Sequence, residues 1–152
     1  MTMAYQETMK QRSKDNFLES RDDLKILVVE DNLMICQLIG LILDSFHCRL
    51  TLADNGKIAL EKLQTSRFDL ILMDLYMPEM NGLEATSLIR SMERETGEHI
   101  PILAMTGFPL RNGYEYCINA GMDDYLTKPF DITDFLGAIE RLTHIKLEEL
   151  VQ

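Results

Sequence analysis

Short apolar runs alternate with longer amphipathic stretches over most of the chain, and this alternation constrains the fold more strongly than any other feature of the sequence. The runs are rich in Val, Ile and Leu and have the length of buried strands. The stretches between them carry apolar residues at the spacing of one helix face. Strand and helix therefore alternate along the chain, which predicts an α/β fold built on a parallel sheet.

Five strand and helix units are predicted from Lys25 onward. The predicted strands are 25–29, 49–53, 69–73, 101–104 and 123–126. The predicted helices are 33–46, 55–66, 82–95, 110–120 and 132–145. Because crossovers between parallel strands are right-handed, five such units favour a doubly wound sheet of order 2-1-3-4-5. The predicted architecture is a flavodoxin-like three-layer αβα fold.

The regular pattern marks out one domain, predicted to span residues 24–146. A chain of 152 residues that is 46% hydrophobic has enough apolar material for one substantial core. Residues 1–23 form a polar leader, and their composition is compatible both with disorder and with a short helix. Residues 147–152 are predicted to be a short tail.

The charge and cysteine content restrict the partners and the location of the protein. A formal net charge of −10 disfavours nucleic acid and anionic membranes as direct partners, because both are bound mainly through Lys and Arg. No apolar run is long enough to predict a signal peptide or membrane insertion. The three cysteines, Cys36, Cys48 and Cys117, lie in apolar segments and are odd in number, which favours buried thiols and a cytoplasmic location over a disulfide framework.

The predicted topology places ligands at the carboxyl ends of the strands, near the point where the strand order reverses. Polar residues of the sequence gather at those positions. They follow the first, third, fourth and fifth predicted strands and are Glu30, Asp31, Asp74, Thr106 and Lys128, the last of which precedes Pro129. Four strand ends are therefore expected to converge on one crevice.

Three carboxylates in one partly desolvated crevice would repel one another strongly unless a cation were bound. Mg²⁺ suits such a site because it binds a few carboxylates and keeps positions open for phosphate oxygens. Asp74 is then a candidate nucleophile for a phosphoryl group, with Lys128 and Thr106 as phosphate ligands. Each residue alone has an ordinary alternative as a cap, a turn residue or a surface charge, but their shared position favours the site.

At these residues the chain resembles the receiver domains of two-component response regulators, both standalone ones and those fused to hybrid histidine kinases. The resemblance extends from Leu24 to Leu142. The motifs that carry it are VVEDN (28–32), ADNG (53–56), DLILMDLYMPEMNGLEA (69–85), PILAMTG (101–107) and GMDDYLTKPF (121–130).

The resemblance implies a role for each residue of the crevice. Asp74 is implied as the phosphoacceptor, and Mg²⁺ is implied as the cofactor. The implied metal ligands are Glu30, Asp31, Asp74 and the backbone carbonyl of Tyr76. The implied phosphate-binding and switch residues are Thr106, Lys128 and the aromatic residue Tyr125. Pro129 is expected to follow a cis peptide bond.

The resemblance further implies a function in a two-component phosphorelay. A phosphoryl group is expected to pass from phosphohistidine, on a histidine kinase or a histidine phosphotransfer protein, to Asp74 and then to be hydrolysed slowly. The domain is expected to be a signalling switch that catalyses only these two steps, and not an enzyme. The phosphoryl group would bias a two-state equilibrium and change contacts with a downstream protein target. The expected assembly is a monomer or a phosphorylation-dependent dimer.

Three features depart from the usual pattern of the family. Glu30 replaces the more frequent Asp, which lengthens one arm of the crevice. The segment 108–113 (FPLRNG) is unlike the charged run that is usual there, and it predicts a fourth helix that is short or begins late. Tyr76 is bulky, and we expect it to slow the approach of hydrolytic water to the phosphorylated Asp74.

The first predicted helix carries more apolar residues than one face needs. Its predicted inner face consists of Leu38, Ile39, Ile42, Leu43 and Phe46. Three further apolar residues, Leu33, Met34 and Leu41, are then left on the outer side. This surplus predicts either a docking surface for a histidine-bearing helical bundle or a surface covered by the leader.

Other functions are less well supported by the sequence. Phosphatases of similar fold carry a second Asp two residues after the nucleophile, and Tyr76 stands at that position here. A phosphate-independent interaction module is disfavoured by the intact set of crevice residues. The short tail is too small for an output domain, and the initiating Met1 favours a standalone receiver over a piece of a larger kinase.

Overall fold

The computed structural model describes residues 23–107 and 111–151 of the chain. The predicted leader lies outside these residues apart from Asp23. None of the helices in the described ranges is long and apolar enough to cross a membrane.

Five strands and five α-helices alternate within the described residues, as the sequence predicts. The strands are β1 (Lys25–Val29), β2 (Arg49–Ala53), β3 (Leu70–Asp74), β4 (Ile102–Thr106) and β5 (Asp124–Thr127). The helices are α2 (Leu33–Asp44), α3 (Gly56–Thr65), α4 (Gly82–Thr96), α5 (Gly113–Asn119), α6 (Ile132–Thr143) and the 3-10 helix η1 (Leu147–Val151).

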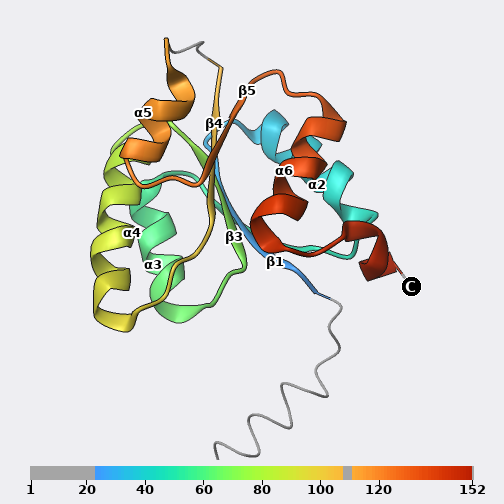
Figure 1. Cartoon of the computed structure of the whole chain (residues 1–152), viewed down its shortest axis with the longest axis horizontal. Coiled ribbons are helices and arrows are strands. Elements are labelled where there is room, and N and C mark those ends of the chain that lie inside the picture. The colour runs from blue at the N-terminus through green and yellow to red at the C-terminus, as the bar shows by residue number, and fades with distance from the viewer. Residues whose placement is uncertain (1–22, 108–110, 152) are drawn as a thin grey trace, which may run out of the picture.

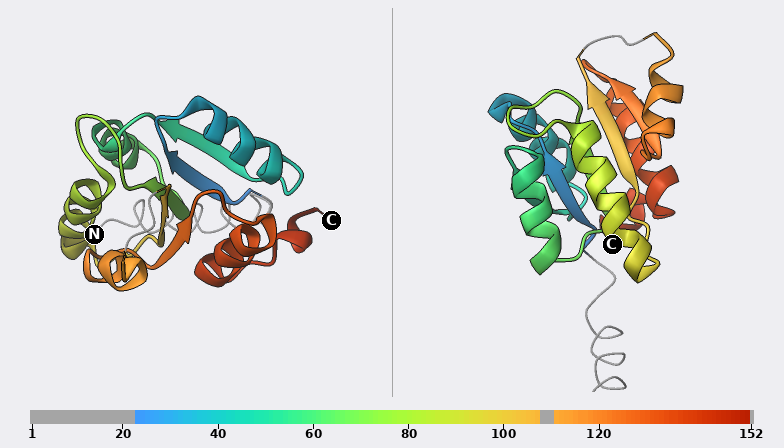
Figure 2. Two further views of the ribbon diagram at one scale, coloured as in Figure 1. Left: turned by 90° about the horizontal axis from the view of Figure 1, so that it is seen from above. Right: turned by 90° about the vertical axis from the view of Figure 1, so that its left-hand side faces the viewer.

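All five strands are parallel and form one sheet of order β2-β1-β3-β4-β5, which confirms the predicted topology. Helices α2 and α6 cover one face of the sheet, and α3, α4 and α5 cover the other (Figures 1 and 2). The result is the predicted three-layer αβα arrangement, in which the carboxyl ends of the strands share one edge.

The core consists of two clusters separated by the sheet. Alternate residues of a buried strand point to opposite faces, so neighbouring apolar residues enter different clusters. In β1, Val28 packs with α2 and α6, whereas Val29 packs with α3 and α4. The continuously apolar runs of β1, β3 and β4 are explained by this double burial, because these strands are central and have helices on both faces.

The helix beginnings are defined by side-chain caps. Asn32, Asn55, Asn81 and Asp131 each accept hydrogen bonds from backbone N–H groups of the first turn that follows. Such caps satisfy donors that have no partner within the helix. All four of these helices follow the carboxyl end of a strand, so the caps also fix the loops at the edge of the sheet that holds the candidate site.

The inner face of α2 differs from the predicted one at Leu38. The buried residues of this helix are Cys36, Ile39 and Leu43, at the spacing of a single helix face. Leu38 is one residue out of this phase and is 49% exposed. The prediction was wrong for Leu38, because it placed this residue inward for its hydrophobicity although its position falls outside the buried helix face. The small residue Cys36 takes the inner position.

The structure differs from the prediction in two segments, the start of α5 and the C-terminal residues beyond α6. Helix α5 begins at Gly113, three residues after the predicted start at 110, in keeping with the expectation of a short or late helix. Beyond α6, the segment expected to be a tail forms η1, in which Leu147 and Leu150 are buried against the core. The packed part of the domain therefore extends to Leu150.

Candidate functional site

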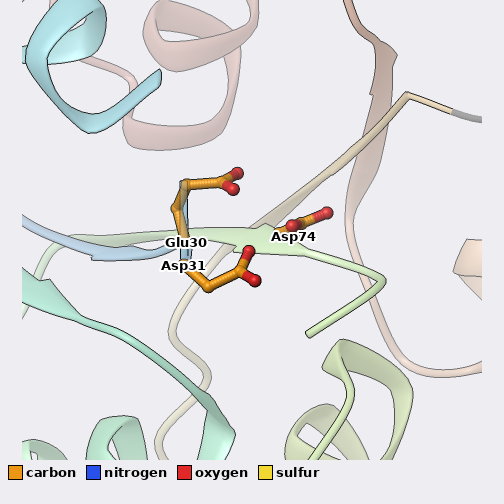
Figure 3. Close-up of side chains that lie close together, drawn as sticks. All are labelled: Glu30, Asp31 and Asp74. Carbon is orange, nitrogen blue, oxygen red and sulfur yellow. The ribbon is translucent and has the colours of Figure 1, made fainter. Parts of the chain in front are cut away.

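Three carboxylates lie together at the carboxyl edge of the sheet. Glu30 and Asp31 directly follow β1, and Asp74 is the last residue of β3. Each offers one oxygen, and these oxygens lie within 4.8 Å of one another (Figure 3). Glu30 and Asp74 are buried, whereas Asp31 is exposed. The group is therefore open to solvent on one side only.

The pairing of the strands explains why these residues meet. β1 and β3 are neighbours, and Val29 pairs with Met73 in register. The next residues along the two strands are Glu30 and Asp74. On its other side Glu30 continues the sheet pairing, because its backbone N–H donates to the carbonyl of Ala53 at 3.0 Å. The positions of the carboxylates thus follow from the register of the central strands.

Lys128 supplies the cation of the site. Its Nζ lies 2.5 Å from Oε2 of Glu30 and 3.5 Å from Oδ1 of Asp74. The residue follows β5, and its backbone N–H donates to the carbonyl of Thr106 at 2.7 Å. The peptide bond from Lys128 to Pro129 is cis. A side chain 98 residues from Glu30 in sequence therefore reaches the ends of β1 and β3.

The electrostatics of Glu30 reflect its burial. Burial raises the pKa of its carboxyl group, and the nearby charge of Asp74 raises the pKa further. The hydrogen bond from Lys128 acts in the opposite direction and lowers the pKa. Counted as ionised groups, three carboxylates and one ammonium leave an excess of negative charge. Such a set of hard oxygen donors fits a hard divalent cation such as Mg²⁺.

The other predicted residues lie on the neighbouring strands. Thr106 is the last residue of β4 and is fully buried. Tyr125 lies on β5 and pairs with Ala104 of β4 in register. Tyr76 is 51% exposed in the loop after β3, and its backbone N–H donates to Oδ1 of Asp74 at 3.4 Å. Thr106 and Tyr76 thus lie at or just beyond the carboxyl edge that holds the carboxylates, whereas Tyr125 lies within β5, two residues before its end.

Gly82 belongs to this arrangement, although the sequence marked it only as the boundary of a helix. A Cβ atom at residue 82 would overlap the backbone carbonyl of Asp74 and crowd the side chain of Met73. The N–H of Gly82 donates to the carbonyl of Leu75 at 3.0 Å. The absence of a side chain therefore allows the start of α4 to lie directly against the strand end that carries Asp74.

Most of the chain matches the model of a known family. The family model described as the response regulator receiver domain matches residues 26–140. The chain belongs to this family. It is a receiver domain of two-component signalling, as the sequence motifs indicated, and receiver domains act as signalling switches.

The related curated proteins are large, and this chain corresponds to a small part of each. It is 36% identical to hybrid signal transduction histidine kinase M of Dictyostelium discoideum over 124 residues, which are 80% of this chain and 5% of the kinase. It is 37% identical to probable histidine kinase 5 of Oryza sativa over 150 residues, covering 84% of this chain and 13% of that protein.

Solved structures support the same assignment. The receiver domain of the sensor histidine kinase PA1611 from Pseudomonas aeruginosa, determined with magnesium coordinated in its active site cleft, is 36% identical with a TM-score of 0.72. The match covers 81% of this chain and 99% of that domain. A second match is the co-crystal structure of the Saccharomyces cerevisiae histidine phosphotransfer protein Ypd1 and the receiver domain of Ssk1. The sequence identity is 27% and the TM-score is 0.73, and the match covers 81% of this chain and 90% of the matched one.

Proposed function

We propose that this receiver accepts a phosphoryl group from a phosphohistidine donor onto the carboxylate of Asp74. The observation that carries the proposal is the cluster of Glu30, Asp31 and Asp74, whose oxygens lie within 4.8 Å, with Lys128 bound to two of them. A capping or turn role would not need three acidic groups and a lysine from three separate segments at one point.

The transfer step is an attack by one oxygen of Asp74 on phosphorus. A bond forms between that oxygen and phosphorus, and the bond between phosphorus and the imidazole nitrogen of the donor breaks. The imidazole leaves with the electron pair, and the product on this chain is an acyl phosphate. Hydrolysis then returns the carboxylate and releases inorganic phosphate. Tyr76 follows Asp74 by two residues and its side chain is exposed, and we expect this bulky side chain to slow the entry of water.

Mg²⁺ is the proposed cofactor of this site. Glu30, Asp31 and Asp74 would hold it, together with the backbone carbonyl of Tyr76. When bound, the ion neutralises charge on the phosphoryl oxygens and on the surrounding carboxylates. The donor set supports this assignment, because all of its members are oxygens and its charge is only partly balanced by Lys128.

Lys128 and Thr106 are proposed to bind the transferred group. Lys128 Nζ already lies within 3.5 Å of Asp74, so a small movement away from Glu30 would place it against a phosphoryl oxygen. Thr106 ends the adjacent strand and would donate its hydroxyl hydrogen to another oxygen. The shifts of Lys128 and Thr106 toward the phosphoryl group would be transmitted to β4, β5 and α5, and would change contacts with a downstream protein target.

The proposed donor is a histidine kinase or a histidine phosphotransfer protein. Its docking surface is proposed to be the outer side of α2, where Leu33, Met34, Leu38 and Leu41 are between 49% and 78% exposed. This helix begins directly after Asp31, so a partner bound there would lie beside the site. The relatives support this proposal, because they include histidine kinases and a receiver solved with a histidine phosphotransfer protein.

The charge and the cysteines of the chain bear on where the switch acts and how it assembles. We place it in the cytoplasm, acting through protein contacts and not through nucleic acid, as a monomer or as a dimer formed on phosphorylation. The three free cysteines and the negative net charge support this setting.

A mass measurement tests the central proposal. The protein is incubated with Mg²⁺ and a small phosphodonor such as acetyl phosphate, and the intact mass is recorded. One phosphoryl adduct is expected, and it should be absent from Asp74→Asn and from protein treated with EDTA. Asp54→Asn is the matched control, because Asp54 follows the neighbouring strand β2 but lies outside the acidic cluster. An unmodified parent protein, or a modified Asp74→Asn variant, would contradict the proposal.

A further inference from the structure

The ring of Tyr125 packs inward, against the first residue of α5. Tyr125 is half-buried and contacts the core cluster that contains Ala104 and Cys117. Its partner across the sheet is Ala104, two residues before Thr106, and Lys128 follows three residues after Tyr125. The ring therefore contacts α5 from a residue of β5 that lies close in sequence and in strand pairing to the phosphate-binding residues proposed above.

The inward position depends on Gly113. A Cβ atom at residue 113 would lie 2.8 Å from Cζ, 2.9 Å from Oη and 3.1 Å from Cε1 of Tyr125. Separations below 3.0 Å do not occur for real Cβ atoms, so any side chain at residue 113 would force the ring or the helix to move. The ring occupies the space that every residue except glycine would fill.

The inward position also carries a cost. The Oη atom of Tyr125 is buried, and among the described residues it has no hydrogen-bond partner. A buried hydroxyl without a partner is unfavourable, whereas an outward ring would place the same hydroxyl in water. The inward ring therefore gains contact area with the core and loses hydration of its hydroxyl.

We propose that Gly113 is the positioning residue that holds Tyr125 inward and thereby sets the resting balance of the switch. The inference rests on the proposed function, because the consequence of moving the ring is read at Thr106 and Lys128. With glycine, the inward ring is accessible before phosphorylation. With a larger residue at 113, the ring is displaced outward and phosphorylation must act against that displacement.

The first experiment measures the ring itself and needs no phosphorylation. The protein is labelled with 3-fluorotyrosine, which enters at five tyrosines, and the resonance of Tyr125 is assigned with Tyr125→Phe. In Gly113→Ala the Tyr125 resonance is expected to shift and to gain a solvent isotope effect, because the ring becomes exposed. The control is Gly40→Ala, since a Cβ at residue 40 of α2 meets nothing within 4 Å. An unchanged Tyr125 resonance in Gly113→Ala would overturn the proposal.

The second experiment measures the rate of phosphorylation by acetyl phosphate. We expect Gly113→Ala to lower the rate by roughly fivefold, within the usual range of coupling between two sites, and Gly40→Ala to leave it unchanged. Tyr125→Leu combined with Gly113→Ala should react at the rate of Tyr125→Leu alone, because the shorter side chain leaves room for the added methyl group. A further loss of rate when Gly113→Ala is added to Tyr125→Leu would contradict the proposal.

A folding failure of Gly113→Ala and a failure of the proposed function can each be told apart from a failure of this inference. If Gly113→Ala alone fails to fold, the double variant with Tyr125→Leu is expected to fold, and a double variant that also fails would overturn the assignment of the contact. If no variant and not even the parent protein is phosphorylated, the proposed function fails, whereas the resonance of Tyr125 still decides whether Gly113 positions the ring.

Discussion

Arg90 of α4 shows how much a single side chain can organise at the edge of the sheet opposite to the acidic cluster. Its guanidinium donates to Glu93 Oε2 at 2.7 Å, to Asp123 Oδ2 at 2.8 Å, and to the backbone carbonyls of Gly121 and Ile100. The two carboxylates in turn accept the backbone N–H groups of Ile100 and Ile102. The network ties the end of α4 to the start of β4 and the turn before β5.

Replacing Arg90 by Met is expected to destabilise the fold by about 2–4 kcal/mol, because the partly buried carboxylates of Glu93 and Asp123 lose their cation. Urea denaturation measures the change. The matched control is Arg49→Met, which breaks the exposed ion pair with Asp23 and should cost less than about 1 kcal/mol. Equal losses in the two variants would show that the Arg90 network adds nothing beyond a surface pair.

Gly82 lies close against the backbone of Asp74. The added methyl group of Gly82→Ala would meet the backbone of Asp74, so we expect a loss of at least about 2 kcal/mol of folding stability. Gly40→Ala also replaces a helical glycine but meets nothing, and it should be neutral or stabilising by up to about 1 kcal/mol. Denaturation curves of the two variants decide the matter, and a stable Gly82→Ala would refute the close approach.

At the scale of elements, η1 completes one face of the core. Leu147 and Leu150 are 1% and 8% exposed and pack with α2 and α6. The backbone N–H of Leu147 donates to Oε1 of Glu140, which connects η1 to α6 at 3.0 Å. A short helix is otherwise only marginally stable, so these tertiary contacts hold it in place.

Truncation of one η1 side chain tests this packing. Leu147→Ala is expected to cost about 2–4 kcal/mol, the usual range for deleting a buried leucine side chain. Val151→Ala, in the same helix but 50% exposed, should change stability by less than about 0.5 kcal/mol. Thermal unfolding of both variants distinguishes a packed element from a frayed end, for which the two values would be equal.

Helix α2 raises a question of function at the same scale. Leu41→Lys is expected to leave stability within about 0.5 kcal/mol, because the side chain is 77% exposed. Phosphorylation by acetyl phosphate should be unchanged, whereas phosphotransfer from a histidine phosphotransfer protein should slow by roughly tenfold if an interface leucine is lost. The control is Leu88→Lys, because Leu88 is 43% exposed but lies on α4 and not on α2. Faster transfer after deletion of residues 1–22 would instead indicate that the leader covers α2.

At the scale of the whole molecule, the thiols report on the integrity of the two core clusters. Cys36 and Cys117 lie in opposite clusters, and burial raises the pKa of both thiols. Burial raises the pKa of Cys48 from 9.0 to about 11. All three should therefore remain protonated and unreactive in the folded protein near pH 8.

Thiol titration with a disulfide reagent at pH 8 is expected to show almost no reaction in native buffer and three equivalents in guanidinium. The stability should fall as the pH rises from about 9 to 11, because the unfolded chain releases the Cys48 proton before the folded one does. Cys48→Ala should reduce this slope, as seen in urea midpoints at pH 8 and pH 10.5. A native Cys48 that reacts rapidly at pH 8 would contradict its burial.

The sequence by itself determined the fold class, the strand order and the gathering of Glu30, Asp31 and Asp74. These follow from local hydrophobic periods and from residues at strand ends, which a parallel sheet brings to one edge. It predicted the strand bounds to within two residues, since the turn residues that bound them are local.

The tertiary structure decided what distant residues do to one another. The bond of Lys128 to Glu30, the burial of Leu147 and Leu150, and the place of Cys36 in the core depend on contacts across the chain. The close packing of the Tyr125 ring against Gly113 also depends on such contacts, whereas the sequence showed only an unusual helix start there. Hydrophobic patterns record whether a residue is apolar but not which neighbour fills the space beside it, and close packing is settled by that neighbour.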